Sequence, residues 1–432
     1  MTERPIDRRT VLGLTGAGAI TLAAGCVSTT DEETPTDSGG NGGDGGDGGN
    51  EATATDSGGS SQPYSIGVVN SLTGSLSAFG ARNKRGMELA LRDVNETTIR
   101  GRELDVIVED SESTSSSGVS AAQKLVNQDG VPFLIGAVGS GVSLAIYESV
   151  VNGTDVVQLS QNSTGTDLTN YPGLLRMSPP GGVQSSALAS LVNADGHDSV
   201  ALAWVNNDYG QGLAETFRNE WDGDIVYDEP HDQGASSYAS VVSSMANSDA
   251  DAWVFITYQP EFTTMAQEAY SNGYEAPYYG ADSVQGSDVL DGTPEGSLEG
   301  MQVVVPSAAV SQENYQQFAS DFEAEYDQRP TSWAAFMYDC VVTAALSIAT
   351  ADEFTGSALQ ATVRDVTRPE GEEVFTFAEA MDVLGENGTA SDIDYQGVSG
   401  PIDFDENGDP IGFLQVLTVQ DHEYVQTDTV QG

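Results

Sequence analysis

The 432-residue sequence has very few basic residues. It contains 15 lysines and arginines against 66 aspartates and glutamates, which gives a formal net charge of −51. Lys84 and Lys124 are its only lysines. Nucleic-acid binding requires clustered lysine or arginine side chains that neutralise phosphates. The composition therefore excludes nucleic acid as a partner.

Cysteine, histidine and the common catalytic motifs are also scarce. Cys340 lies in the apolar run YDCVVTAALSIA, where a small buried side chain is expected, and Cys26 lies near the N-terminus. We expect no intrachain disulfide in the mature chain. The three histidines form no paired metal motif, and neither a G-x-S-x-G turn nor a Walker-type phosphate loop occurs. These absences argue against an enzyme, and we expect no metal and no cofactor.

One short segment copies the front half of a calcium loop. Asp403, Asp405, Asn407 and Gly408 have the right spacing, but the twelfth position is Leu414 rather than a bidentate glutamate. A turn between two strands is the simpler interpretation. The segment GPIDFDENGDPIGFLQVLTV is therefore predicted to form a closing hairpin.

The first 26 residues have the layout of an export signal. Arg8 and Arg9 precede an apolar run that ends at Cys26 and is shorter than the ~20 residues that span a bilayer. The arginine pair resembles a twin-arginine signal, and LAAGC resembles a lipobox, whose cysteine is lipidated and becomes the mature N-terminus. An N-terminal anchor helix is the alternative. We predict export, and anchoring by lipid at Cys26 to the outer face of the cytoplasmic membrane.

Residues 27–62 are rich in glycine, serine and aspartate and are predicted to form a disordered acidic tether. A flexible coil of this length reaches roughly 30–35 Å. Acidic residues continue through the rest of the chain, and their self-repulsion is screened only at high salt, where the Debye length is about 3 Å at 1 M. The pattern resembles that of haloarchaeal lipoproteins. An acidic surface for a metal or a basic partner is the alternative.

From Tyr64 onward, short apolar runs alternate with amphipathic ones, and the order starts again after Gly181. This alternation predicts an α/β fold with two doubly wound lobes of parallel sheet joined by a hinge. Residues 307–395 are mostly helical and are expected to rejoin the first lobe. The predicted N-terminal lobe is thus 64–181 plus 307–395, and the C-terminal lobe is 182–306 plus 396–432.

Polar loops follow the apolar strands, at the edge where ligands bind in such folds. Gly139-Ser140-Gly141 offers N–H groups and a hydroxyl suited to a carboxylate, although helix capping is the commoner reason for a serine there. Asp282 follows a strand that ends in Tyr-Tyr-Gly, and is either a counter-charge for a cation or a helix cap. Three aromatic residues either line a cleft or pack in a core: Phe79, Tyr209 and Tyr258.

The order of these segments resembles that of the type I periplasmic binding proteins, in particular the Leu/Ile/Val-type substrate-binding proteins of branched-chain amino-acid ABC transporters. The matching segments are SLTGSLSAFG, KRGMELALRDVN, AAQKLVNQDGVPFLIGAVGSG, NNDYGQG, GPIDF and SWAAFMYD. The resemblance covers nearly all of residues 64–432. It implies a Venus-flytrap protein whose lobes close on a ligand without chemistry on it.

The resemblance implies roles for residues on the first lobe. Ser140 matches the serine that holds the α-carboxylate of the ligand, and Thr164 matches the threonine that assists it. Asn162 sits where a backbone carbonyl meets the α-ammonium group. Gly139 replaces a more usual serine, and Asn162-Ser163 replaces a smaller pair, which alters the expected shape of the pocket.

On the other side of the predicted cleft, Tyr258 matches the aromatic residue of the second lobe that closes over the ligand. Asp282 falls where the family often has an acid that binds the ammonium group. Phe79 and Tyr209 occupy aromatic positions that flank the cleft.

The sequence therefore predicts a monomeric, extracytoplasmic substrate-binding lipoprotein of an ABC importer. Its expected ligand is a branched-chain or other small amino acid, or a related amide or carboxylate, which it delivers to a permease. The alternative is a sensory ligand-binding subunit of a membrane receptor. A neighbouring permease gene would separate the two.

Overall fold

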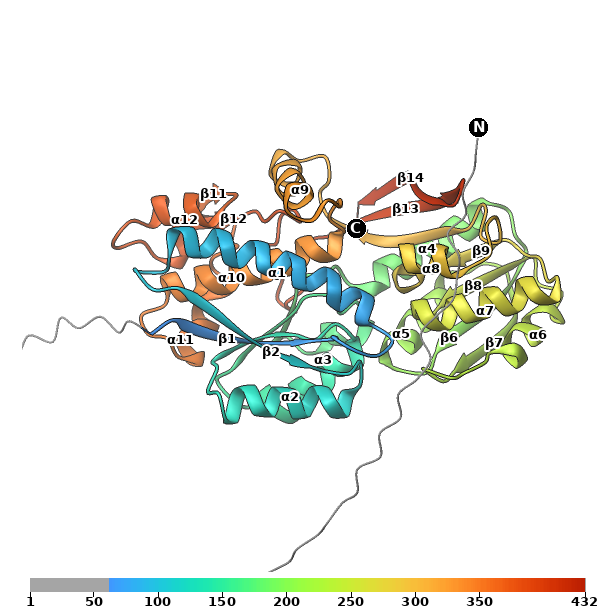
Figure 1. The fold of residues 1–432 in the computed structure, drawn as a ribbon, viewed down its shortest axis with the longest axis horizontal. Helices are drawn as coiled ribbons and strands as arrows, with labels where there is room; N and C mark the ends of the chain where they lie inside the picture. Colours follow the sequence, from blue (N-terminus) through green and yellow to red (C-terminus); the bar gives the residue numbers. More distant parts are fainter. Residues whose placement is uncertain (1–61, 432) are drawn as a thin grey trace, which may run out of the picture. The chain divides into compact units, whose positions relative to one another are not determined.

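The computed structural model of the protein describes residues 62–431 (Figure 1). The predicted export signal of residues 1–26, with Cys26, lies outside the described residues. So does the predicted tether up to residue 61.

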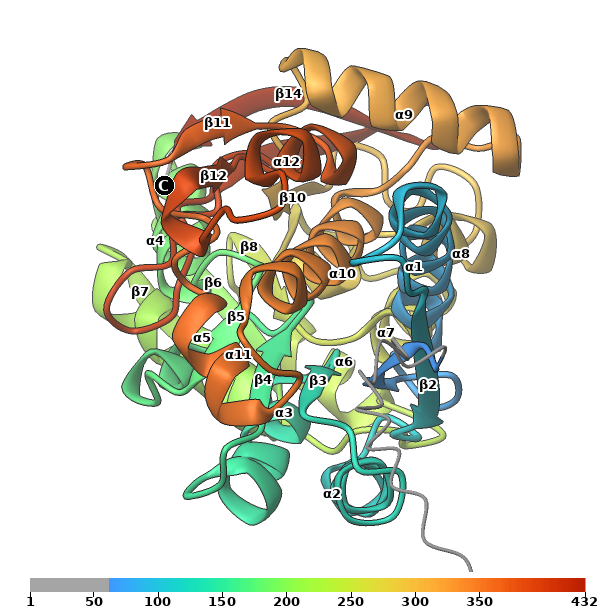
Figure 2. The same cartoon turned by 90° about the vertical axis from the view of Figure 1, so that its left-hand side faces the viewer.

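The first sheet consists of five parallel strands in the order β2-β1-β3-β4-β5. The side chains of β1 alternate between the two faces of this sheet. Ile66 and Val68 pack with residues of α1 and α10, whereas Val69 packs with residues of α2 and α3. Figures 1 and 2 show these two pairs of helices on opposite faces of the sheet. The first lobe is this sheet with its helices. Its first elements are β1 (Tyr64–Asn70), α1 (Ser77–Thr97), β2 (Leu104–Asp110), α2 (Ser115–Asn127), β3 (Phe133–Gly136), α3 (Ser140–Ile146), the π-helix Tyr147–Val151, β4 (Val157–Ser160), the 3₁₀ helix Thr166–Asn170 and β5 (Leu174–Arg176).

The second sheet has seven strands in the order β14-β13-β10-β9-β8-β6-β7. Strands β7, β6, β8, β9 and β10 are parallel to one another, whereas β13 is antiparallel both to β10 and to β14. Leu202 and Val254 pack toward α4 and α5, and Ala203 and Phe255 pack toward α6 and α7. The elements of this second lobe are α4 (Gly181–Ala194), β6 (Ser199–Val205), α5 (Asp208–Glu220), β7 (Asp224–His231), α6 (Ala239–Ala246), β8 (Ala252–Ile256), α7 (Gln259–Asn272), β9 (Tyr278–Gly280), the 3₁₀ helix Asp282–Val284, α8 (Ser287–Gly292), β10 (Gln302–Ser307), β13 (Phe413–Gln420) and β14 (Glu423–Gln431).

The segment between β10 and β13 is mostly helical, as predicted, and α10 within it packs against α1 of the first lobe. Cys340 lies in α10 and is fully buried, which confirms its expected role as a small core side chain. Among the described residues α10 is the one helix whose length and apolar composition would suit a membrane span, but it is buried inside the protein. The elements here are α9 (Glu313–Tyr326), α10 (Ser332–Thr350), α11 (Gly356–Thr362), β11 (Glu372–Val374), α12 (Phe377–Leu384), the 3₁₀ helix Ala390–Asp392 and β12 (Ile393–Tyr395).

The predicted closing hairpin was misplaced. Residues 401–412 contain a turn but no strand, and the antiparallel hairpin is formed by β13 and β14, which are joined through Asp421 and His422. Asp405 accepts hydrogen bonds from the backbone N–H groups of Asn407 and Asp409, at 2.8 and 2.9 Å. The Asp-Glu-Asn-Gly segment is therefore a local turn in the connection between the lobes.

Candidate ligand-binding site

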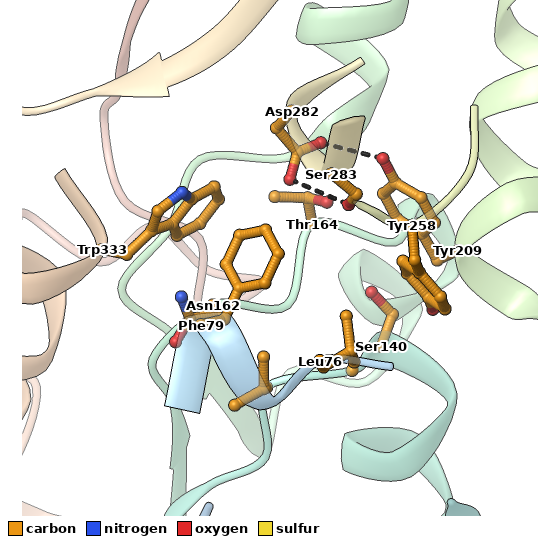
Figure 3. A pocket seen from close by; sticks show the side chains of 12 residues that line it. Leu76, Phe79, Ser140, Asn162, Thr164, Tyr209, Tyr258, Asp282, Ser283 and Trp333 are labelled. Carbon is orange, nitrogen blue, oxygen red and sulfur yellow. Dashed lines mark hydrogen bonds between the residues drawn. The ribbon is translucent and has the colours of Figure 1, made fainter. Parts of the chain in front are cut away.

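A small cavity lies between the two lobes, at the carboxyl ends of the parallel strands. Loops after β1, β3 and β4 form one wall, and loops after β6, β8 and β9 form the other. Figure 3 shows the labelled side chains of the two walls pointing toward one another. The lining residues are Leu76, Phe79, Val138, Gly139, Ser140, Asn162, Thr164, Tyr209, Tyr258, Asp282, Ser283 and Trp333.

All seven residues predicted from the sequence to bind ligand line this one cavity: Phe79, Ser140, Asn162, Thr164, Tyr209, Tyr258 and Asp282. Each is almost completely buried, with between 2% and 5% of its surface exposed. Sequence reasoning assigned no role to four further lining residues: Leu76, Val138, Ser283 and Trp333. Trp333 lies in the segment SWAAFMYD and Leu76 lies in SLTGSLSAFG. Both segments match the family, so the resemblance could have pointed to these two residues.

Ser140 is the first residue of α3, and its hydroxyl is oriented by a loop from β4. The Oγ atom of Ser140 accepts a hydrogen bond of 2.9 Å from the backbone N–H of Gly165. Within residues 62–431 the hydroxyls of Ser140 and Thr164 donate no hydrogen bond, so both remain available to a group in the cavity. The first N–H groups of a helix also lack intrahelical acceptors. This wall is therefore rich in donors and suits a carboxylate.

A buried arginine, Arg176, holds the loop that carries Thr164. Arg176 donates hydrogen bonds to the carbonyl of Gly165 at 2.8 Å and to the hydroxyl of Thr169 at 2.6 Å. Its Nε atom pairs with Asp409 at 2.5 Å, and Arg176 is fully buried. Because Asp409 belongs to the connection between β12 and β13, this ion pair ties the ligand loop to a segment that joins the lobes.

Asn162 is held by hydrogen bonding within the first lobe. Asn83 on α1 donates a hydrogen bond of 2.7 Å to its side-chain oxygen, Oδ1. The side-chain nitrogen of Asn162 is buried and has no partner among the described residues. It offers a second donor at the cavity wall.

Asp282 supplies the negative charge of the site. Its Oδ1 atom accepts hydrogen bonds from Gln184 at 2.8 Å and from the Tyr209 hydroxyl at 3.0 Å, and Ser283 approaches Oδ2 at 3.4 Å (Figure 3). Within residues 62–431 no basic side chain forms an ion pair with Asp282. Burial raises the pKa of Asp282, and the hydrogen bonds from Gln184 and Tyr209 oppose that rise. A buried carboxylate with only neutral partners favours a cation beside it.

Two stacked tyrosines form the second-lobe wall beside Asp282. The rings of Tyr209 and Tyr258 lie 5.6 Å apart at an interplanar angle of 20°. Asn207 donates a hydrogen bond of 2.9 Å to the hydroxyl of Tyr258 and caps α5 through its side-chain oxygen. Burial raises the pKa of Tyr258, so this phenol stays neutral in the site.

The opposite end of the cavity is apolar. Phe79 and Trp333 meet edge to face, with ring centroids 5.5 Å apart and an interplanar angle of 75°. Leu76 and Val138 complete this part of the lining. The site therefore combines donors on one wall, a carboxylate on the other and an apolar end.

The lobes are closed around the cavity. Only about 20 Å³ of the cavity admits the centre of a water molecule. Ser75 of the first lobe donates a hydrogen bond of 2.9 Å to Glu261 of the second lobe, and Glu261 is 1% exposed. A cavity this tight holds one or two waters, so a larger occupant requires the lobes to part.

Comparison with known proteins agrees with this arrangement. The model of the periplasmic binding protein family matches residues 63–420. The Leu/Ile/Val-binding protein homolog 3 of Brucella melitensis is 27% identical over 230 residues, which cover 52% of this chain and 62% of that protein. The Leu/Ile/Val-binding protein BraC3 of Rhizobium johnstonii is 26% identical over 242 residues, which cover 53% of this chain and 65% of that protein. The match thus spans less than two thirds of the length of these relatives.

Solved structures show the same fold. A leucine-binding protein of Thermotoga maritima superposes with a TM-score of 0.74 at 22% identity, covering 85% of this chain and 98% of that one. A branched-chain amino-acid transporter substrate-binding protein of Streptococcus pneumoniae, solved with isoleucine, also gives a TM-score of 0.74 at 22% identity, covering 86% and 100%.

The fold and the matching family model define a two-lobed binding protein rather than an enzyme. The chain belongs to the periplasmic binding protein family, as a type I member related to the branched-chain amino-acid binding proteins of ABC transporters. This confirms the fold class and the family predicted from the sequence. Members of the family are extracytoplasmic.

Proposed function

We propose that this protein binds a branched-chain or other small amino acid, or a related amide or carboxylate, and delivers it to an ABC permease. The observation that carries the proposal is the carboxylate of Asp282, which is buried at the cavity wall with neutral partners only. An α-ammonium group is a cation of suitable size to neutralise it. A plain carboxylate ligand would leave Asp282 without a counter-charge.

The remaining groups of an amino acid have matching partners. Ser140 and Thr164 can donate hydrogen bonds to the α-carboxylate from the first-lobe wall. The edge-to-face pair of Phe79 and Trp333 can contact an aliphatic side chain. The closed cavity admits the centre of a water molecule over about 20 Å³, far below the roughly 300–1,000 Å³ found for ligand pockets, so the lobes must part before a ligand is bound.

Closure of the lobes around this ligand is proposed to occur at three connections: residues 177–180, 308–312 and 396–412. The third is held to the first lobe at two points, because Asp409 pairs with Arg176 of β5 and Asp339 of α10 accepts hydrogen bonds from the backbone of Val398 and Ser399. The proposed lobes are those predicted from the sequence, 64–181 plus 307–395 and 182–306 plus 396–432, and the last segment is counted to the second lobe because its strands β13 and β14 extend the second sheet. Bound ligand would bridge the lobes and favour the closed form.

The ligand class is tested by a thermal-shift screen of amino acids, amides and aromatic acids in molar salt, followed by calorimetry of the compounds that stabilise the protein. We expect small apolar amino acids to give the largest shifts, and the matching ammonium-free carboxylic acids to give none. Equal binding of an amino acid and its ammonium-free analogue would contradict the assignment to Asp282. Binding of amides or urea alone would redirect the proposal to that class.

We further propose that the protein is exported by a twin-arginine signal, lipidated at Cys26 and tethered beside its permease as a monomer. The support is the arginine pair at Arg8 and Arg9 and the lipobox-like sequence that ends at Cys26. Cys26→Ser should release the protein from membranes or leave it as an unprocessed precursor. Unchanged processing and membrane retention of this variant would rule out the lipid anchor.

A further inference from the structure

One ion pair is buried behind the first-lobe wall of the candidate ligand site. The side chains of Arg176 and Asp409 are 0% and 7% exposed, whereas in the other five ion pairs within residues 62–431 both side chains are at least 25% exposed. A buried ion pair contributes little net stability, because the loss of hydration offsets much of the attraction between the charges. Stability alone therefore explains this pair poorly.

The guanidinium of Arg176 holds three segments of the chain together. Its Nε atom pairs at 2.5 Å with Asp409, in the connection between β12 and β13. Nη1 donates to the carbonyl oxygen of Gly165 at 2.8 Å, and Nη2 donates to the hydroxyl of Thr169 at 2.6 Å. Thr169 in turn donates to Oδ2 of Asp409 at 2.7 Å. Each nitrogen atom of the planar guanidinium thus has its own fixed acceptor.

The carboxylate of Asp409 is itself held in place by the backbone around it. The N–H group of Asp409 donates to Oδ1 of Asp405 at 2.9 Å. The backbone N–H of Arg176 donates to the carbonyl of Gly408 at 3.1 Å. Asp409 therefore belongs to a turn that is bonded to the end of β5, and it gives the guanidinium a fixed counter-charge.

Gly165 connects the ion pair to the ligand site. Its carbonyl accepts the hydrogen bond from Arg176, and its N–H donates at 2.9 Å to Oγ of Ser140. A side-chain carbon added at Gly165 would lie 2.7 Å from Cβ of Ser140, so the two residues are in close contact. A displacement of Gly165 would therefore change the hydrogen bond that orients the hydroxyl of Ser140.

The orientation of this hydroxyl matters for a carboxylate ligand. Because Oγ of Ser140 already accepts the N–H of Gly165, its O–H is left to donate toward the cavity. A donor that is oriented before the ligand arrives loses less conformational freedom on binding. Arg176 and Asp409 lie outside the cavity lining, so their effect on binding passes through the loop that carries Gly165.

We propose that Arg176 and Asp409 are positioning residues for ligand binding. The pair fixes Gly165, whose N–H orients the hydroxyl of Ser140 toward the carboxylate of the ligand. Lysine could not replace Arg176, because an ammonium group lacks the planar fork that directs three donors to three acceptors. The role in ligand binding rests on the proposed function, whereas the positioning of Gly165 does not.

Hydrogen exchange of the unliganded full-length protein, followed by NMR, tests the positioning without any ligand. Thr169→Val keeps the size of the side chain but removes the hydroxyl that joins Arg176 to Asp409. We expect the amide of Gly165 to exchange about 5-fold faster in this variant, the factor that corresponds to one hydrogen bond of ~1 kcal/mol. The amides of β6 in the second lobe should exchange as in the wild type.

Arg364→Gln is the matched control. The half-buried Arg364 binds the same connection through the carbonyl oxygens of Asp405 and Pro172, and within residues 62–431 it forms no hydrogen bond to Gly165. This variant should leave the exchange of Gly165 unchanged. Unchanged exchange of Gly165 in Thr169→Val, or equal acceleration in the control, would overturn the proposal.

The effect on binding is measured as the affinity for L-leucine, by calorimetry at molar salt. The test variant combines Arg176→Met with Asp409→Leu, so that no unpaired charge stays buried. If the pair acts through Ser140, this replacement can weaken binding by no more than Ser140→Ala does, which is roughly 5- to 30-fold. In a Ser140→Ala background the same replacement should cause no further loss of affinity.

This non-additivity separates positioning from general damage to the fold, which would weaken binding by the same factor in both backgrounds. Equal losses in both backgrounds, or no loss in either, would overturn the role in binding. If the double replacement does not fold, Thr169→Val takes its place in the same cycle. If no amino acid binds to the wild type, the proposed function fails, whereas the exchange of Gly165 still decides the positioning.

Discussion

The carboxyl group of Asp282 is surrounded by neutral partners, so a cation that enters the cavity meets an uncompensated negative charge. Asp282→Asn keeps the shape of the side chain and the acceptor for Gln184 and Tyr209, but it removes this charge. Breaking a buried ion pair costs roughly 3–5 kcal/mol. We therefore expect amino-acid affinity to fall at least ~100-fold, at about 1.4 kcal/mol per decade.

Calorimetry at molar salt measures this loss, and the exposed Asp222→Asn is the matched control. Ser140→Ala should reduce the binding free energy by less, about 1–2 kcal/mol, because backbone N–H donors remain near the carboxylate of the ligand. Wild-type affinity in Asp282→Asn would show that Asp282 is structural and that the ligand carries no ammonium group.

Ligand affinity should also depend on pH through Asp282. Burial raises the pKa of this carboxyl above its usual value, so the unliganded protein takes up a proton at a higher pH than an exposed aspartate does. A bound ammonium group favours the ionised form and lowers the pKa again. Affinity should thus be constant near neutrality and should fall as pH is lowered through the raised pKa, with proton release on binding in that range.

Calorimetry in buffers of different ionisation enthalpy detects the released proton. The same titrations on Asp282→Asn should show no proton release. A ligand affinity that rises on acidification would contradict the assignment of Asp282 as the partner of the ammonium group.

The polar part of the site could be predicted because parallel strands bring their carboxyl ends together. Ser140, Thr164, Tyr258 and Asp282 lie in loops that follow apolar strands, so the strand pattern placed these loops at one edge, and the resemblance to the family singled out these residues within them. Trp333 could not be found this way, because it lies on a helix from a distant part of the chain. Its contact with Phe79 depends on how α10 packs against α1.

The contact between α1 and α10 depends on a glycine. A side-chain carbon added at Gly86 would lie 2.1 Å from the backbone oxygen of Ala334, far inside any normal contact. Gly86→Ala should therefore destabilise the protein by about 1–3 kcal/mol, although alanine favours helix more than glycine does. Because Ala334 adjoins Trp333, the variant should also weaken ligand binding.

Chemical denaturation of Gly86→Ala checks this expectation. Gly182→Ala is the matched control, because an added carbon there has only Thr166 nearby, at 3.9 Å, and should be tolerated. Equal stability of wild type and Gly86→Ala would mean that α1 and α10 can move apart without a loss of folding free energy.

Strand and helix alternation predicted most elements because the central parallel strands, such as β3, β4 and β8, are buried on both sides of their sheets and therefore form continuous apolar runs. The hairpin was misplaced for a physical reason. A turn such as that at Asp405 satisfies its own hydrogen bonds and forms whether or not strands flank it. The true hairpin turns at Asp421 and His422, both with positive φ, which no glycine marks in the sequence.

The charge of the whole molecule should make its stability depend steeply on salt. Within residues 62–431 six ion pairs form, which leaves most carboxylates of these residues without an ion-pair partner. The Debye length grows from about 3 Å at 1 M to about 30 Å at 0.01 M salt, so repulsion between these groups increases on dilution. The melting temperature, followed by circular dichroism, should fall steeply from molar to millimolar salt. A flat profile would contradict a halophilic origin.

The tight closure around the cavity also limits how fast a ligand can enter. Because about 20 Å³ admits the centre of a water molecule, an amino acid cannot diffuse into the closed form and must wait for the hydrogen bond between Ser75 and Glu261 to break. The observed association rate in stopped-flow experiments should therefore level off as ligand concentration rises, at the rate of lobe opening. Ser75→Ala removes this hydrogen bond and should raise the plateau. An association rate that stays proportional to ligand concentration would contradict this expectation, because it would mean that an open form is already abundant and that the ligand binds to it directly.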